Sequence, residues 1–260
     1  NEKTAVTGFN LGEFQALLGV GGQFENTNSR LIGLKQFDDY TKIVAILYST
    51  KDALLSNRSF RQALSYAAPQ IENKTPAQGP YPPSFWAYSA DLKNYLSNPD
   101  SAKAALDRVK NSSSPELLKN ELALTSTPQH EAVAKKIVSL WREAGINASL
   151  RVESGIPQNF QALIITQSIP LDPDQYFLWH STQEKTNLTK YDSKRADKDL
   201  EDGRKTMKEE DRKVKYADFQ KALLEDSPAT FLYFPKYNVS YLKKAEGKLN
   251  QVLPLQLSTL

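Results

Sequence analysis

Residues 167–183 combine groups that could bind or react with a small molecule. They include two carboxylates, Asp172 and Asp174, and His180, which is one of only two histidines in the chain. Two aspartates beside a histidine could act as the acid and base of a hydrolase. The prolines around the aspartates favour another interpretation, in which at least one aspartate forms a turn or caps a helix from Gln175 onward.

Metal and covalent chemistry have little support in the sequence. The Asp172–Asp174 segment lacks the glycine and the further oxygen ligands of a calcium loop. The absence of cysteine excludes thiolate zinc sites, cysteine nucleophiles and disulfides. No nucleophile elbow, phosphate-binding loop, dinucleotide fingerprint or zinc-protease motif occurs. The second histidine, His130, begins a predicted helix, where we expect it to be solvated. We therefore predict no catalytic residue, no metal and no cofactor.

A second candidate segment is the aromatic loop at residues 73–90. Its centre, residues 79–83, contains three prolines and cannot be helical. The loop also carries Tyr81 and Trp86. Aromatic side chains in a long loop either anchor it to the core or line a pocket, and both roles are open for these two.

These segments must be positioned by strands and helices that the residue pattern predicts. An apolar strand at 160–166 leads directly into residues 167–183, and a loop after a buried strand is where α/β proteins often bind ligands. A strand near 122–124, an amphipathic helix at 133–144 and a strand at 148–152 form a βαβ unit, which predicts two parallel strands. The other elements that we expect are strands at 43–48, 229–234 and 237–242, and helices after Asn10, after Ser56 or Asn57, after Asn98, at 196–207 and at 211–225. The helix after Asn10 rests on the spacing of Phe14, Leu17 and Leu18, with glycines 19, 21 and 22 as its stop.

The charge pattern argues against a polyanionic partner. The chain has 33 basic and 30 acidic residues, for a net charge of +3. The two signs are interspersed, as in residues 205–213, which predicts a solvated mixed-charge face and no nucleic-acid site. No apolar run approaches the roughly 18 residues of a membrane span.

Six segments, taken in order, resemble those of the family 5 extracellular solute-binding proteins, the peptide-binding subunits of oligopeptide and dipeptide ABC transporters. They are LLSNRSFRQALSYA at 54–67, NPDSAKAAL at 98–106, WREAGIN at 141–147 within 130–150, DPDQYF at 172–177, DRKVKYADFQ at 211–220 and SPATFLYF at 227–234. Asn187 and Tyr191 also match the asparagine and tyrosine of the family.

The resemblance implies an α/β fold: a mixed-sheet lobe of a type II periplasmic-binding-protein clamshell, with helices packed on both sheet faces. It implies that residues 46–235 form the C-terminal ligand-binding lobe. Residues 1–45, with one helix and one strand, and the return segment 236–260 would belong to an N-terminal lobe that this chain lacks. The chain would then be a fragment of a non-enzymatic binding protein located outside the cytoplasm, either periplasmic or anchored as a lipoprotein. Its partners would be a peptide or other small solute, the permease subunits and the missing lobe.

The resemblance also implies a ligand wall. Its residues are Gln167, Ser168, Asp172, Asp174, Tyr176, Trp179, His180, Asn187, Tyr81 and Trp86. One position departs from the family, because the aspartate that pairs with a peptide's amino terminus falls on Ile169 or Pro170. A non-peptide solute such as a sugar or a chelated metal is therefore an alternative. Two further alternatives are a hydrolase that uses Asp172, Asp174 and His180, and a loop that docks on the permease.

Overall fold

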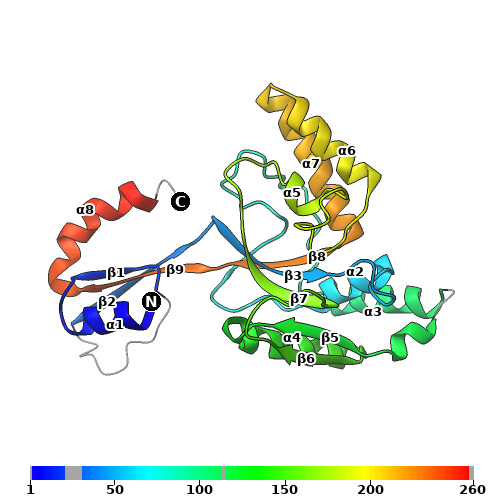
Figure 1. Cartoon of the computed structure of the whole chain (residues 1–260), viewed down its shortest axis with the longest axis horizontal. Helices are drawn as coiled ribbons and strands as arrows, with labels where there is room; N and C mark the ends of the chain where they lie inside the picture. Colours follow the sequence, from blue (N-terminus) through cyan, green and yellow to red (C-terminus); the bar gives the residue numbers. More distant parts are fainter. Residues whose placement is uncertain (1, 21–30, 113–114, 258–260) are drawn as a thin grey trace. The chain divides into compact units, whose positions relative to one another are not determined.

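The computed structural model describes residues 2–20, 31–112 and 115–257, and the chain divides into two compact units (Figure 1). One unit combines Asn1–Thr41 with Pro235–Leu260, and the other is Lys42–Phe234. The larger unit contains all ten residues that were predicted for the ligand wall.

The smaller unit is built on a three-stranded antiparallel sheet in the order β1-β9-β2. Its elements are α1 (Glu2–Asn10), β1 (Ala16–Leu18), β2 (Ile32–Asp38), β9 (Lys236–Leu242), the short 3-10 helix η3 (Lys243–Ala245) and α8 (Glu246–Leu257). Val239 and Tyr241 of β9 form its buried centre. Gly33 lies opposite Tyr241, and a Cβ at this position would come within 2.3 Å of the tyrosine ring. Only glycine fits that register without moving the ring.

The predicted helix after Asn10 is wrong. Asn10 is the last residue of α1, and Gly12 follows in the left-handed region with a φ of +78°. Leu17 lies in β1 and pairs with Ser240 of β9. Pairing with a strand more than 200 residues away therefore overrides the local helical spacing. Two of the glycines expected to stop that helix, 21 and 22, lie outside the described residues.

The larger unit is built on a six-stranded mixed sheet in the order β4-β8-β3-β7-β5-β6. The strands are β3 (Lys42–Tyr48), β4 (Thr75–Pro76), β5 (Leu122–Ser126), β6 (Ala148–Val152), β7 (Ala162–Ser168) and β8 (Ala229–Phe234). The central strand β3 pairs antiparallel with β7 and β8, whereas β5 runs parallel to β6 and β7. The helices are α2 (Arg58–Ala67), α3 (Pro99–Lys110), η1 (Pro115–Lys119), η2 (Pro128–His130), α4 (Glu131–Glu143), α5 (Tyr176–Trp179), α6 (Lys194–Lys205) and α7 (Glu209–Asp226).

The predicted βαβ unit is confirmed. Helix α4 connects β5 to β6, and the two strands are parallel. Gly145 follows α4 with a φ of +87°, as expected for a glycine after a helix C-terminus. Trp141 of α4 is fully buried, and its indole nitrogen donates a hydrogen bond to the Leu64 carbonyl of α2 at 3.0 Å. This bond joins the crossover helix to α2.

Helices cover both faces of the large sheet, as neighbouring residues of β8 show. The Thr230 hydroxyl contacts Ser65 of α2 at 2.6 Å, whereas the Phe231 ring contacts Trp179 of α5 with 6.1 Å between ring centroids. Successive strand residues point to opposite faces, so α2 and α5 lie on different sides of the sheet. Figure 1 shows α2 and α4 on one side and the α6–α7 hairpin on the other.

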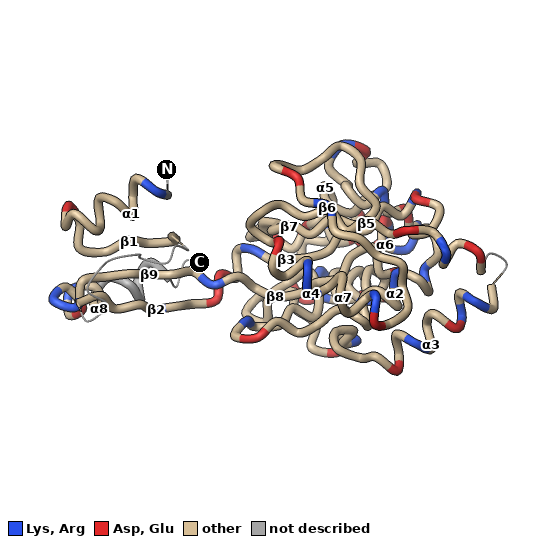
Figure 2. Tube along the Cα trace, turned by 90° about the horizontal axis from the view of Figure 1, so that it is seen from below, with Lys and Arg blue, Asp and Glu red and all other residues tan. Residues whose placement is uncertain are grey.

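The charged residues of the larger unit are interspersed along the trace, with no extended stretch of one sign (Figure 2). Among the described residues, no helix combines the length and the apolar character needed to span a membrane.

Candidate functional site

The segment after β7 crosses one face of the large sheet from end to end. Ser168, the last residue of β7, pairs with Lys42 at the start of β3. Farther along, the Thr189 carbonyl accepts a hydrogen bond from the Thr50 backbone amide, two residues beyond the end of β3. The segment thus runs alongside the whole of β3, and a strand of the length of β3 spans about 20 Å. The predicted ligand wall is therefore a strip about 20 Å long, with Gln167 and Ser168 at one end and Asn187 at the other.

Four of the ten predicted wall residues are buried: Tyr81, Trp179, His180 and Asn187. The Tyr81 hydroxyl donates a hydrogen bond to the Pro173 carbonyl, and the Trp179 indole nitrogen donates to the Gln175 side chain at 2.8 Å. Tyr81 is thus an anchor of the aromatic loop, which decides between the two roles left open for it. The side chains of these four residues pack into the protein and hold the strip in place. Any contact with a solute therefore falls mainly to the other six predicted wall residues.

Asn187 organises the far end of the strip. Its amide nitrogen donates to the Tyr191 carbonyl at 2.8 Å and more distantly to the carbonyls of Trp179 and His180. Its side-chain oxygen accepts from the Thr189 hydroxyl at 2.8 Å and from the Tyr191 backbone amide at 3.2 Å. Every hydrogen-bonding group of this buried amide is thereby satisfied within one loop.

Asp172 and Asp174 form the predicted turns. Asp172 accepts a hydrogen bond from the Asp174 backbone amide at 2.9 Å, and Asp174 accepts one from the Tyr176 amide at the start of α5, at 3.1 Å. Each carboxylate also binds an arginine. Arg212 of α7 contacts both oxygens of Asp172, at 2.8 and 3.1 Å, and Arg204 of α6 contacts Asp174 at 2.9 Å.

Aromatic rings hold both arginines in place. The Arg204 guanidinium lies 4.3 Å from the centre of the Tyr176 ring and 5.9 Å from that of Phe177. The Arg212 guanidinium lies 5.4 Å from the rings of Trp86 and Tyr216. Guanidinium groups stack favourably on aromatic faces, so each Arg–Asp pair has a defined geometry.

His180 is bound away from the two aspartates. Its ring stacks on Tyr176 at 4.0 Å. Nδ1 accepts from the Thr182 backbone amide at 3.3 Å, which leaves Nε2 to donate to Glu201 of α6 at 3.3 Å. Hydrogen bonds from Lys205 and His180 lower the pKa of Glu201. Among the described contacts, His180 makes no hydrogen bond to Asp172 or Asp174, so the acid–base arrangement required by the hydrolase alternative is not formed.

His130 is not solvated, contrary to the prediction. It is 5% exposed, and its Nε2 lies 2.9 Å from the Thr166 hydroxyl of β7. Burial lowers its pKa. The short helix η2 packs His130 against the neighbouring strand β7, a contact that a helical pattern alone does not reveal.

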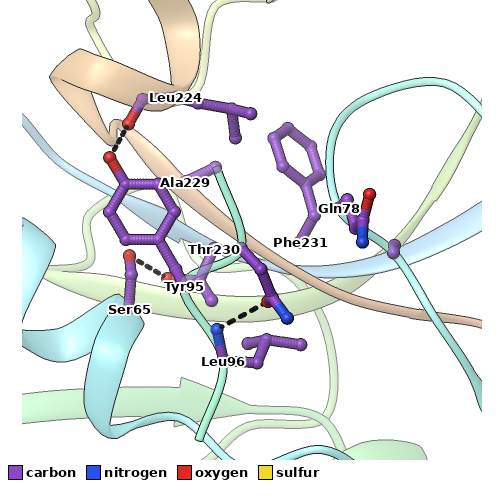
Figure 3. Close-up of a pocket in the computed structure, with 10 residues that line it drawn as sticks. Ser65, Gln78, Tyr95, Leu96, Leu224, Ala229, Thr230 and Phe231 are labelled. Atoms are coloured by element: carbon purple, nitrogen blue, oxygen red, sulfur yellow. Dashed lines mark hydrogen bonds between the residues drawn. The ribbon is translucent and has the colours of Figure 1, made fainter. Parts of the chain in front are cut away.

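Three hollows of the larger unit differ in size and in their distance from the strip. One of about 320 Å³ lies at its far end, beside Lys51, Ser181, Asn187 and Asp192. One of about 600 Å³ lies between α2, α3 and α4, on the opposite sheet face. A third, next to the Ser65–Thr230 hydrogen bond, has a volume of about 10 Å³ (Figure 3). It has room for about one water molecule, so it is too small for a solute. The described residues contain no His, Asp and Glu cluster able to hold a metal ion.

Comparison with known families identifies the chain at the family level. Residues 1–189 match the family described as "Bacterial extracellular solute-binding proteins, family 5 Middle". The chain belongs to the family 5 bacterial extracellular solute-binding proteins. The resemblance drawn from the six sequence segments is thereby confirmed.

Among proteins of similar sequence, the oligopeptide-binding protein AppA of Bacillus subtilis is 32% identical over 103 residues, an alignment that covers 38% of this chain and 19% of AppA. Two solved structures have similar folds. NikZ of Campylobacter jejuni, in complex with Ni(L-His), has a TM-score of 0.77 at 23% identity and matches 94% of this chain and 55% of its own. AppA of B. subtilis, in complex with a nonapeptide, has a TM-score of 0.75 at 20% identity, with coverages of 94% and 54%.

The chain therefore spans about half the length of these two solved chains. The predicted fold class, a mixed-sheet lobe of a type II periplasmic-binding-protein clamshell with helices on both sheet faces, is confirmed. The assignment of 1–45 and 236–260 to an N-terminal lobe stays a prediction.

In this family 5 chain, the position predicted for the amine-binding aspartate carries no charge. Ile169 is 8% exposed, and Pro170 is exposed. The first carboxylate after them is Asp172, which is already paired with Arg212.

Sequence reasoning missed the residues that hold the strip from the side: Arg204, Arg212, Asp197 and Glu201. Asp197 accepts hydrogen bonds from the backbone amide and the hydroxyl of Ser181, at 2.9 and 2.6 Å. The charged run 205–213 was interpreted as a solvated face, but the Arg212 side chain in that run is only 22% exposed. The aspartates and aromatic residues of 172–177 could have indicated that arginine or lysine side chains pack against them. They do not indicate where in the sequence those side chains lie.

Asp199 of α6 is expected to lower the stability of the chain at neutral pH. Burial and the nearby Asp218 carboxylate raise its pKa, and its buried Oδ2 has no hydrogen-bond partner among the described residues. For a carboxyl group whose pKa is raised by folding, the stability contributed by the protonated form is lost as the pH rises through that pKa. Replacing Asp199 with Asn should therefore increase the free energy of unfolding by about 0.5–1 kcal/mol at pH 7.5, after allowance for solvent screening.

Urea unfolding of Asp199→Asn and the unaltered chain at pH 7.5 and pH 4 measures this effect, which should shrink at the lower pH. Asp202→Asn is the matched control, because Asp202 pairs with Lys215 at 3.5 Å. The control should give no gain. An equal gain in both variants would show that removing any acidic charge from α6 stabilises the chain, and would contradict a specific role of Asp199.

Proposed function

We propose that this chain forms one lobe of the solute-binding component of an ABC importer, and that its solute is an oligopeptide. The observation that carries the proposal is the 32% identity to a protein named as oligopeptide-binding, in a chain of family 5. The strip of about 20 Å supports it, because an extended peptide advances about 3.3 Å per residue and about six residues would match that length. Recognition of such a ligand needs hydrogen bonds and pockets, not a nucleophile.

The protein acts, under this proposal, outside the cytoplasm, either free in the periplasm or anchored to the membrane as a lipoprotein. Its partners are the permease subunits and a second lobe that closes over the solute. It performs no reaction, which is supported by the separate engagement of Asp172, Asp174 and His180 by different side chains.

A non-peptide solute is the second candidate. It is favoured by the uncharged Ile169–Pro170 position and by the breadth of ligands named for proteins of this fold, including Ni(L-His) for NikZ and agropinic acid for AgaA of A. tumefaciens.

Isothermal titration of the full-length protein tests the proposal. We expect heat of binding with defined peptides of two to nine residues, and none with Ni(L-His) or with simple sugars. Heat with a chelate or a sugar and none with any peptide would establish the second candidate instead.

Tyr176→Ala should weaken peptide binding about tenfold, because it removes a half-buried ring from the middle of the strip. Tyr176→Phe keeps the ring and loses only a 3.3 Å contact with Thr182, so its affinity should stay within about twofold. Ile156→Ala, at an exposed position of the β6–β7 connection, controls for general surface effects. An unchanged affinity in Tyr176→Ala would remove this residue from the site.

A further inference from the structure

The carboxylates along the strip are compensated by the α6–α7 hairpin. Four acidic side chains lie beside residues 167–183: Asp172 and Asp174 within the strip, and Asp197 and Glu201 on α6. Asp197 accepts two hydrogen bonds from Ser181, and Glu201 binds His180 and Lys205. The two aspartates of the strip itself each face an arginine. Residues 167–183 thus carry two negative charges that are matched by two positive charges from the hairpin.

The two arginines are held by more than their aspartates. Arg212 donates from Nε to the Gly203 carbonyl at 3.2 Å and stacks against two rings. Arg204 lies over Tyr176, which in turn stacks on the buried His180. Because a guanidinium fixed in this way cannot readily turn away, its charge stays next to the aspartate when a solute approaches.

Two apolar side chains near these pairs remain exposed to a solute. Leu171 is 82% exposed and Phe177 is 59% exposed, and each adjoins a residue of an Arg–Asp pair or its aromatic platform. The Asp172 side chain is 55% exposed even with Arg212 bound to it, so without its arginine it would present an unpaired carboxylate beside these apolar groups. An unpaired carboxylate attracts an ammonium group, whereas a paired one does so only weakly.

We infer that Arg204 and Arg212 are specificity-determining residues: by neutralising Asp172 and Asp174 they make this wall select the uncharged parts of a solute over cationic ones. The inference rests on the proposed function, because it requires that the solute contacts residues 167–183. The solutes that this site selects are then peptides whose side chains next to residues 167–183 are uncharged.

The test uses the full-length protein and matched pentapeptides. One set carries norleucine at each position of an alanine pentapeptide in turn, and the other carries lysine at the same positions. These side chains have similar length and differ in charge. The measured quantity is the ratio of the two dissociation constants at each position. A ratio cancels any general loss of affinity that results from a weakened fold.

We expect the unaltered protein to bind norleucine peptides as well as lysine peptides or better. Arg212→Met and Arg204→Met should each shift the ratio about fivefold toward lysine at one or more positions, at low salt. Arg212→Lys keeps the charge and should leave the ratio within about twofold of the original. Arg195→Met removes a guanidinium from α6 that pairs with Glu225 at 2.8 Å, away from the strip, and should also leave it unchanged.

Ratios that do not move at any position in either methionine variant would overturn the inference while leaving the proposed function intact. A shift in Arg195→Met equal to that in Arg212→Met would also overturn it, since the net charge of the hairpin would then explain the preference. If the unaltered protein binds no peptide of either set or of the longer pools, the proposed function fails, and the inference fails with it.

Discussion

Replacing Arg61 with methionine should lower the free energy of unfolding of the chain by about 3–5 kcal/mol. Arg61 is 5% exposed, and its guanidinium donates to four backbone carbonyls. Two belong to the turn before α2, Leu55 at 2.7 Å and Ser56 at 3.1 Å, and two to the C-terminus of α7, Asp226 and Ser227 at 3.2 and 3.1 Å from Nε. Methionine fills a similar volume but leaves these carbonyls without their donor. The last carbonyls of a helix have no partner within the helix, so α7 depends on this side chain.

Two control variants separate charge from geometry at Arg61. Burial lowers the pKa of Arg61 to about 10, so the group stays protonated at neutral pH and its charge is retained in the fold. Arg61→Lys keeps a charge, but one ammonium cannot reach all four carbonyls, and we expect a loss of about 2 kcal/mol. Arg58→Met removes an exposed arginine that lies 3.6 Å from Asp226, and should cost less than about 1 kcal/mol. Urea unfolding of the three variants measures these losses in the free energy of unfolding and ranks them. Equal losses at positions 58 and 61 would contradict the capping role.

The regular elements of the larger unit could be predicted because their signals are local. The βαβ unit follows from alternating strands, an amphipathic helix and Gly145, and each signal is read within a few residues. The start of α2 is equally local, since the Asn57 side chain accepts a hydrogen bond from the Phe60 amide at 3.2 Å. The wrong helix near Leu17 shows the limit of this reasoning. A three-residue strand such as β1 exists only because β9 pairs with it, and β9 lies at the other end of the sequence.

The candidate site could be predicted only in part, for a related physical reason. The aspartate turns at Asp172 and Asp174 are local hydrogen bonds, and they form as expected. The arginines that bind these aspartates come from positions 30 and 40 residues farther along the chain, and no spacing rule connects them. The burial of individual aromatic side chains could not be predicted either. Tyr81 is a buried anchor and Trp86 a half-buried platform for an arginine, although both belong to one aromatic loop. Only the packed structure distinguishes the two roles.

Replacing Asn187 with alanine should lower the free energy of unfolding by about 2–4 kcal/mol. The change removes the buried amide that hydrogen-bonds to the backbone of Trp179, His180 and Tyr191 and to the Thr189 hydroxyl. Thr189→Val is the matched control, because it removes a single hydroxyl that donates to Asn187 at 2.8 Å and should cost about 1 kcal/mol. Asn187→Asp has the same shape but turns an acceptor toward three carbonyls, so it should be at least as damaging as alanine. Urea unfolding ranks the three variants.

The Asn187 result also distinguishes two explanations of the spacing between Asn187 and Tyr191 in this chain. If the asparagine serves chiefly as a solute ligand, Asn187→Ala should reduce solute affinity and leave stability nearly unchanged. If it closes the loop, stability should fall and hydrogen exchange should accelerate around residues 187–191. The structure favours the second explanation, because Asn187 accepts from the Tyr191 amide and donates to its carbonyl, which requires a separation of about four residues. A loss of less than about 1 kcal/mol in Asn187→Ala, together with a loss of solute binding, would return Asn187 to the ligand wall.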